Sequence, residues 1–247
     1  MNNRIRLIAF ALLLGLMSTQ PLIAGKVRIA VAANFTAAMR EIAANFEKST
    51  KHTTVISYGS TGKLYAQIRN GAPFEVFLAA DQRRPQKLEI DGLASERFTY
   101  AMGKLVLWSS DEKRETSKAA LKRGDFKRVA LANPKTAPYG TAAVTTMQRL
   151  GIEAALRKKW VIGDSIAQAH QFVATANAEL GFIALAQIAL DDSGNRWDIP
   201  QTLYDPIRQD AVLLDKGLKN PAAAAFVSFL QSPAAKVVID KYGYATE

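Results

Sequence analysis

Four turns in this chain combine small uncharged residues with a place between an apolar strand-like run and a helical pattern. They are Asn34, Ser60-Thr61-Gly62, Pro138-Tyr139-Gly140 and Asp164-Ser165-Ile166. The start of a helix leaves backbone N–H groups unpaired and carries about half a positive elementary charge, so several converging helix starts bind an anion. The turns therefore predict a site for a small anion, built mainly from neutral hydrogen-bond donors.

Two other interpretations of these turns remain open. Helix capping alone explains any single turn, because Asn, Ser and Thr commonly cap helices. An enzymatic interpretation rests on the tetrapeptide Ser60–Lys63, which matches the S-x-x-K pattern of penicillin-binding proteins and class A β-lactamases. The chain has no S-D-N motif, and its nearest relative of K-T-G is Lys135–Ala137. Serine acyl transfer by Ser60 with Lys63 is thus an alternative without its supporting motifs.

Composition excludes several kinds of chemistry. The 247 residues include no Cys and only two His, His52 and His170. This excludes disulfides, thiolate catalysis and Cys-ligated metals, and it leaves too few His for a His-based zinc site. The formal net charge is +10, but Lys and Arg are scattered over helical patterns. We therefore expect a solvated basic surface and no nucleic-acid partner.

The first 24 residues have the pattern of an export signal. Arg4 and Arg6 precede the apolar run 7–17, which is too short to span a membrane, and Ala24 is a small residue suited to cleavage. Leu22 is not ideal at the third position before the cut, so an uncleaved anchor is the alternative. We expect an exported chain whose signal peptide, residues 1–24, is cleaved near Ala24.

Short apolar runs alternate with amphipathic helical patterns along the rest of the chain, which predicts an α/β fold with mainly parallel sheets. The expected strands are 26–32, 53–58, 74–80, 100–109, 128–132, 160–162, 180–185 and 209–214. The expected helices are 36–49, 61–70, 82–90, 118–123, 141–150, 152–158, 166–175, 221–230 and 233–241. In such folds ligands bind beyond the carboxyl ends of the strands, and the four turns lie there.

The chain shows no internal repeat and no flexible linker, although its length suits two lobes. We therefore expect the chain to cross between lobes on strands near 103–109 and 197–206, which act as a hinge. Residues 25–104 and 205–247 are predicted to form a discontinuous first lobe, and residues 105–204 the second lobe.

Four stretches of the chain together have the pattern of one known family: Ile29–Phe35, Tyr58–Leu64, Gly71–Asp81 and Asn177–Phe182. They resemble the periplasmic molybdate-binding proteins of ABC transporters. The most specific is Gly71–Asp81, which reads G-A-P-x-x-[VL]-x-[IL]-x-A-D. The similarity covers essentially the whole predicted mature chain.

The resemblance implies a type II periplasmic binding protein. Such a protein has two α/β lobes, each a mainly parallel sheet flanked by helices, joined by a hinge of crossing strands. It clamps molybdate or tungstate between the lobes and delivers the ion to a membrane permease. The resemblance further implies a periplasmic monomer that is not an enzyme and has no cofactor. Molybdenum is bound only as its oxyanion and not as a metal cation.

The resemblance also implies the site residues. In the first lobe the side chains and backbones of Asn34 and Thr61 donate, in the second lobe the backbone N–H groups of Tyr139 and Ile166 donate, and Ala33, Ser60 and Gly62 border the ligand. Two positions depart from the family pattern, because Asn34 stands where Ser is common and Ala184 stands where many members have Tyr. Asp164 could accept a hydrogen bond from a protonated ion or cap the helix at Ile166. Binding of sulfate or another small oxyanion therefore remains an alternative.

Overall fold

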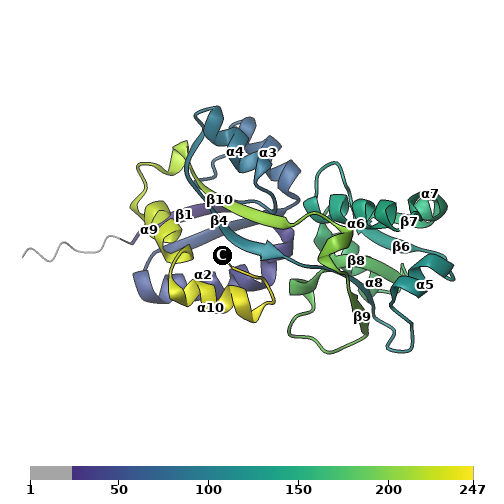
Figure 1. Ribbon diagram of the computed structural model, residues 1–247. Helices are drawn as coiled ribbons and strands as arrows, with labels where there is room; N and C mark the ends of the chain where they lie inside the picture. Colours follow the sequence, from purple (N-terminus) through teal and green to yellow (C-terminus); the bar gives the residue numbers. More distant parts are fainter. Residues whose placement is uncertain (1–23, 247) are drawn as a thin grey trace, which may run out of the picture.

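The computed structural model describes residues 24–246 and shows two α/β lobes side by side (Figure 1). The predicted signal peptide lies outside the described residues except for Ala24. Within the described part of the chain, no single helix is long and apolar enough to cross a membrane, and only the bent pair of C-terminal helices passes that test jointly.

The first lobe contains a five-stranded sheet in the order β2-β1-β3-β10-β4. Its strands are β1 (Lys26–Ala32), β2 (Thr53–Gly59), β3 (Val76–Leu78), β4 (Ala94–Gly103) and β10 (Ile207–Leu214). β2, β1 and β3 pair in parallel, whereas β10 is antiparallel to both β3 and β4. The sheet is therefore mixed: the chain re-enters the first lobe along β10, which runs opposite to its two neighbours.

Helices cover both faces of this sheet. They are α2 (Thr36–Thr50), α3 (Thr61–Arg69), α4 (Arg83–Ile90), α9 (Pro221–Leu230) and α10 (Pro233–Lys241), with the short 3-10 helices η1 (Ala33–Phe35) and η5 (Asp215–Gly217) at strand ends. Successive side chains of a strand point to opposite faces. Accordingly Ile29 packs with the α2, α9 and α10 side, and Ala30 packs with Leu64 of α3 and Leu88 of α4.

The second lobe contains a sheet in the order β7-β6-β8-β5-β9. Its strands are β5 (Leu105–Ser109), β6 (Val129–Ala132), β7 (Trp160–Gly163), β8 (Leu180–Ala184) and β9 (Asn195–Asp198). Its helices are α5 (Lys118–Arg123), α6 (Pro138–Arg149), α7 (Glu153–Leu156) and α8 (Ile166–Ala174), with 3-10 helices η2 (Arg157–Lys159), η3 (Leu185–Gln187) and η4 (Gln201–Leu203). β7, β6 and β8 are parallel, while β5 is antiparallel to β8 and β9.

The chain passes between the lobes twice. β4 ends at Gly103, which pairs with Ile207 in the first sheet, and Leu105 pairs with Ala184 in the second. The expected single strand 100–109 is therefore wrong, because Lys104 separates two strands that belong to different sheets. The second passage, residues 199–206, contains η4 and no strand, so the expected crossing strand near 197–206 ends at Asp198. The lobe limits 25–104 with 205–247 and 105–204 stay a prediction.

Candidate functional site

A small cavity between the lobes collects the first residues of several helices. Its volume is about 10 Å³, which is close to the space of one water-sized sphere, so the lobes lie close together around it in this conformation. It is lined by Ala32, Ala33, Asn34, Gly59, Ser60, Thr61, Ala80, Ala137, Pro138, Tyr139 and Ile166. None of these described lining residues is charged. The cavity therefore offers an anion neutral donors and helix starts only.

The lining residues come from four helix starts, which are those of η1, α3, α6 and α8. η1 leads into α2, and α3, α6 and α8 span 9, 12 and 9 residues. The residue before the first turn makes no side-chain capping bond in η1, α3 or α6, whereas Ser165 caps α8 by accepting from Gln168 N–H. Helix starts from both lobes thus line one cavity, which is an arrangement that attracts negative charge.

Ser60 and Thr61 bring two hydroxyls to this point. The Ser60 side chain is 4% exposed, and its Oγ is buried without a hydrogen-bond partner. Thr61 Oγ1 accepts from Ala80 N–H at 3.0 Å, which leaves its own hydrogen free to donate. A buried unpaired hydroxyl costs about 1–3 kcal/mol. The Ser60 hydroxyl is therefore the strongest local sign of an absent acceptor.

The side chain of Asn34 is hydrogen-bonded within the protein. Asn34 Nδ2 donates to Gln209 Oε1 at 2.8 Å and to Tyr244 Oη at 3.0 Å, so both amide hydrogens already have protein acceptors. The Tyr244 hydroxyl in turn donates to the Asn34 carbonyl at 2.8 Å. These bonds hold the η1 turn, so in this conformation the Asn34 amide side chain bonds to the protein, and its expected donation to a ligand stays a prediction.

Tyr139 connects the two lobes behind the cavity. It lies in the first turn of α6, is 1% exposed, and its hydroxyl accepts from Gln209 Nε2 of β10 at 3.5 Å. Burial raises the pKa of the Tyr139 phenol well above its ordinary value, so the hydroxyl stays protonated. The Tyr100 and Tyr244 phenols nearby have raised pKa values for the same reason. The group is a neutral hydrogen-bonded network with no charge to repel an anion.

The remaining predicted residues separate into two groups. Ala33, Ser60 and Ile166 line the cavity. Gly62 is not among the lining residues, because its N–H donates to Thr136 O of the second lobe at 2.8 Å. Asp164 neither faces the cavity nor caps α8, since its carboxylate lies 2.9 Å from Lys63 Nζ and Ser165 is the cap.

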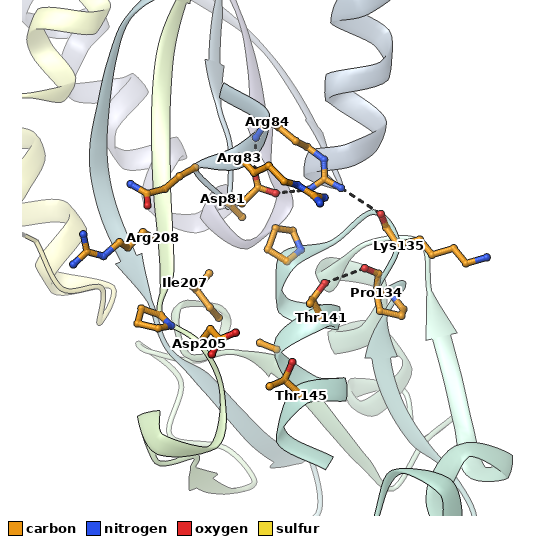
Figure 2. A pocket seen from close by; sticks show the side chains of 15 residues that line it. Asp81, Arg83, Arg84, Pro134, Lys135, Thr141, Thr145, Asp205, Ile207 and Arg208 are labelled. Atoms are coloured by element: carbon orange, nitrogen blue, oxygen red, sulfur yellow. Dashed lines mark hydrogen bonds and ion pairs between the residues drawn. The ribbon is translucent and has the colours of Figure 1, made fainter. Parts of the chain in front are cut away.

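A larger cavity of about 560 Å³ lies beside the small one and shares Ala80 and Pro138 with it. Figure 2 shows basic and acidic side chains around it, with Arg84 bonded to Asp81 and reaching toward Lys135 of the other lobe. Two acidic side chains, Asp81 and Asp205, and four basic ones, Arg83, Arg84, Lys135 and Arg208, line this space. The small cavity is the better candidate for a site built from neutral donors, because no charged residue is among the described residues that line it.

Comparison with known proteins places this architecture. A family model described as bacterial extracellular solute-binding protein matches residues 27–245. The chain belongs to this family. The molybdate-binding protein ModA of Azotobacter vinelandii is 56% identical over 230 residues, which is 91% of each chain. ModA of Rhodobacter capsulatus is 50% identical over 241 residues, covering 97% of this chain and 95% of that protein.

A solved structure agrees with these relatives. The periplasmic molybdate-binding protein of Azotobacter vinelandii matches with a TM-score of 0.86 and 38% identity, over 90% of this chain and 99% of that one. The resemblance and the fold class expected from the sequence are both confirmed. By name, these similar proteins are molybdate-binding proteins.

The geometry gives the enzymatic alternative no support. A serine nucleophile needs its base within hydrogen-bond reach. Ser60 Oγ has no hydrogen-bond partner, and Lys63 Nζ pairs with Asp164 in the other lobe. The S-x-x-K spacing therefore does not bring the two groups together.

Three residues of the site region escaped the sequence analysis: Gln209, Tyr100 and Tyr244. Gln209 is fully buried at the centre of β10, and Tyr100 donates to its Oε1 at 3.2 Å. The available signal was a Gln in a strand whose second half is apolar, because a buried amide needs hydrogen-bond partners. The hydrogen-bond partners of Gln209 are distant in sequence, so the sequence pattern could have indicated this residue but not which groups it bonds.

Proposed function

We propose that this chain is the extracytoplasmic solute-binding component of a molybdate ABC transporter. The observation that carries the proposal is the convergence of helix starts from both lobes on one uncharged cavity that holds the unpaired Ser60 hydroxyl. The 56% identical relative is a molybdate-binding protein by name, which supports molybdate as the ion. In the present chain, the proposed ligand donors are the backbone N–H groups of Asn34, Tyr139 and Ile166.

The hydroxyls of Ser60 and Thr61 complete this donor set. Neutral donors suit a fully deprotonated tetrahedral dianion, because each such bond to a charged acceptor contributes about 1.5–3 kcal/mol. A monoprotonated ion such as hydrogen phosphate needs an acceptor, and no carboxylate is among the described cavity residues. Tungstate has nearly the size and charge of molybdate, so we propose that both bind.

The remaining parts of the proposal follow from this role. The chain acts as an exported periplasmic monomer, makes or breaks no covalent bond, needs no cofactor, and passes its ion to a membrane permease. Residues 25–104 with 205–247 and residues 105–204 are the lobes that enclose the ion.

Calorimetric titration of the metal-free protein with molybdate, tungstate, sulfate and phosphate tests the proposal. We expect tight one-to-one binding of molybdate and tungstate, weaker binding of sulfate and none of phosphate. Thr61→Ala removes a hydroxyl donor and weakens molybdate binding, whereas Thr61→Ser retains it. Thr175→Ala, at the far end of α8, is the control with unchanged affinity. If sulfate binds more tightly than molybdate, the chain is a sulfate-binding protein and the proposal of a molybdate-binding protein is wrong.

A further inference from the structure

The lobes also touch one another directly outside the cavity. Gly62 N–H donates to Thr136 O at 2.8 Å, Arg84 Nη2 donates to Lys135 O at 3.2 Å, and Lys63 Nζ lies 2.9 Å from Asp164 Oδ2. We call these three contacts the closure seam. Figure 2 shows the Arg84 contact bridging the two lobes. The seam pairs groups of the protein with each other, so it exists only when the lobes are together.

Gly62 occupies the tightest position of the seam. A Cβ at this residue would lie 2.9 Å from Thr136 Cα and 3.0 Å from both Thr136 O and Arg84 Nη2. The backbone at Thr136 has little freedom to move away, because Thr136 N–H and Ala137 N–H both donate to Asn133 O in a tight turn. Any larger side chain at Gly62 therefore keeps the lobes apart.

Within the first lobe, the same Cβ would meet the end of a flexible side chain, that of Arg84, whose Nη2 would lie 3.0 Å away. Gly62 stands in the first turn of α3, after Thr61, where an L-residue is acceptable, and Ala is a better helix former than Gly. The nearest rigid atoms to the added Cβ, Thr136 Cα and Thr136 O, belong to the other lobe. Each lobe should fold normally with Ala there, and only their approach is obstructed.

We propose that Gly62 determines the affinity for the ion without touching it, by permitting the seam to close. This inference rests on the proposed oxyanion binding. When only a fraction of the protein molecules adopt the conformation that binds the ligand, the apparent affinity is reduced by that fraction. A variant that closes in one molecule in about a hundred thus binds about a hundredfold more weakly.

The Lys63–Asp164 ion pair allows a second and milder change to the contact between the lobes. Its side chains are 49% and 72% exposed, so the pair is screened and contributes little by itself. Reversing Lys63 to an acid instead places like charges across the seam. Exchanging both charges restores attraction while the net charge of the protein returns to its original value.

The test compares Gly62→Ala with Gln67→Ala, an exposed position of the same helix, by molybdate calorimetry, thermal unfolding and small-angle X-ray scattering. We expect at least a tenfold weaker molybdate affinity for Gly62→Ala and an unliganded melting temperature equal to or above that of the wild type. Its radius of gyration at saturating molybdate should stay larger than that of the wild type. Gln67→Ala should match the wild type in every measurement.

Lys63→Glu keeps the proposal testable if Gly62→Ala folds poorly. We expect it to weaken molybdate binding severalfold at low salt, and the double variant Lys63→Glu/Asp164→Lys to recover the affinity. If Gly62→Ala binds molybdate with the affinity of the wild type, or if the double variant does not recover the affinity, the inference about the closure seam is wrong and the proposed function is unaffected. Absence of molybdate binding by the wild type overturns the proposed function as well, so the two failures are distinguishable.

Discussion

Replacing Ser60 by Ala should weaken anion binding while leaving the free protein as stable as before or more stable. Ser60 Oγ is buried without a partner, and Ser60 makes no capping bond to α3 although it stands at the cap position. Truncation therefore removes an unsatisfied group that costs about 1–3 kcal/mol when buried. Most buried Ser to Ala changes at a helix cap have the opposite sign, since they lose a bond of about 1 kcal/mol.

The loss in binding follows from the charge of the ion. A hydrogen bond to a charged partner contributes about 1.5–3 kcal/mol, and each 1.4 kcal/mol is a factor of ten, so Ser60→Ala should raise the molybdate Kd about 10- to 150-fold. Calorimetry measures this change directly. Thermal unfolding with and without molybdate measures the same effect as a smaller ligand-induced shift, because ligand binding stabilises the folded state by mass action.

Two control variants separate this reasoning from general damage. Thr146→Val removes a buried hydroxyl of α6 that donates to Ala142 O and does not line the cavity, and should leave the Kd unchanged. Ser117→Ala removes the side chain that accepts from Ala120 N–H at the start of α5, and should lower stability without changing the Kd. An unchanged Kd in Ser60→Ala, or a loss of stability without a loss of affinity, would refute the role given to this hydroxyl.

Two further outcomes are expected. Gly103→Ala places a Cβ 2.0 Å from Tyr139 Oη and 2.8 Å from Gln209 Nε2, so it should destabilise the fold by about 1–3 kcal/mol and weaken molybdate binding, as measured by urea unfolding and calorimetry. Burial against Trp108 lowers the pKa of His170 from its ordinary 6.5, so the unfolded chain binds more protons below that pH. Stability should therefore fall as the pH drops from 6.5 through the lowered pKa; a wild-type melting curve with the same pH dependence as His170→Gln between pH 5 and 7 would contradict this.

Local signals located most helices well. Helices were expected at 118–123, 221–230 and 233–241, and the structure has them at these residues. Each helix is preceded by a cap residue whose side chain accepts a hydrogen bond from a backbone N–H of the first turn. These cap residues are Ser117, Asn220 and Ser232. Pro at the first position of the last two also favours a helix start there. These determinants lie within a few residues of the element they define.

Strand boundaries at the lobe junction could not be obtained in this way. The run 100–109 is continuously suited to a strand, yet Lys104 divides it between two sheets because the partners of Gly103 and Leu105 lie in β10 and β8. The expected crossing strand near 197–206 overlaps β9 only at Trp197 and Asp198, because Asn195–Asp198 is an edge strand next to a turn and its pairing with β5 sets its limits. Pairing partners are distant in sequence, so periodicity alone does not reveal them.

The sequence by itself determined where the candidate donors stand, because a small polar turn between an apolar run and an amphipathic helix is a local pattern. The tertiary structure decided what each of those residues does. It directs the amide of Asn34 to Gln209 and Tyr244, leaves the Ser60 hydroxyl without a partner, and places Gly62 against the backbone of the opposite lobe. The physical reason is that a hydrogen bond or a close contact depends on both partners, and here the partners are up to 210 residues apart.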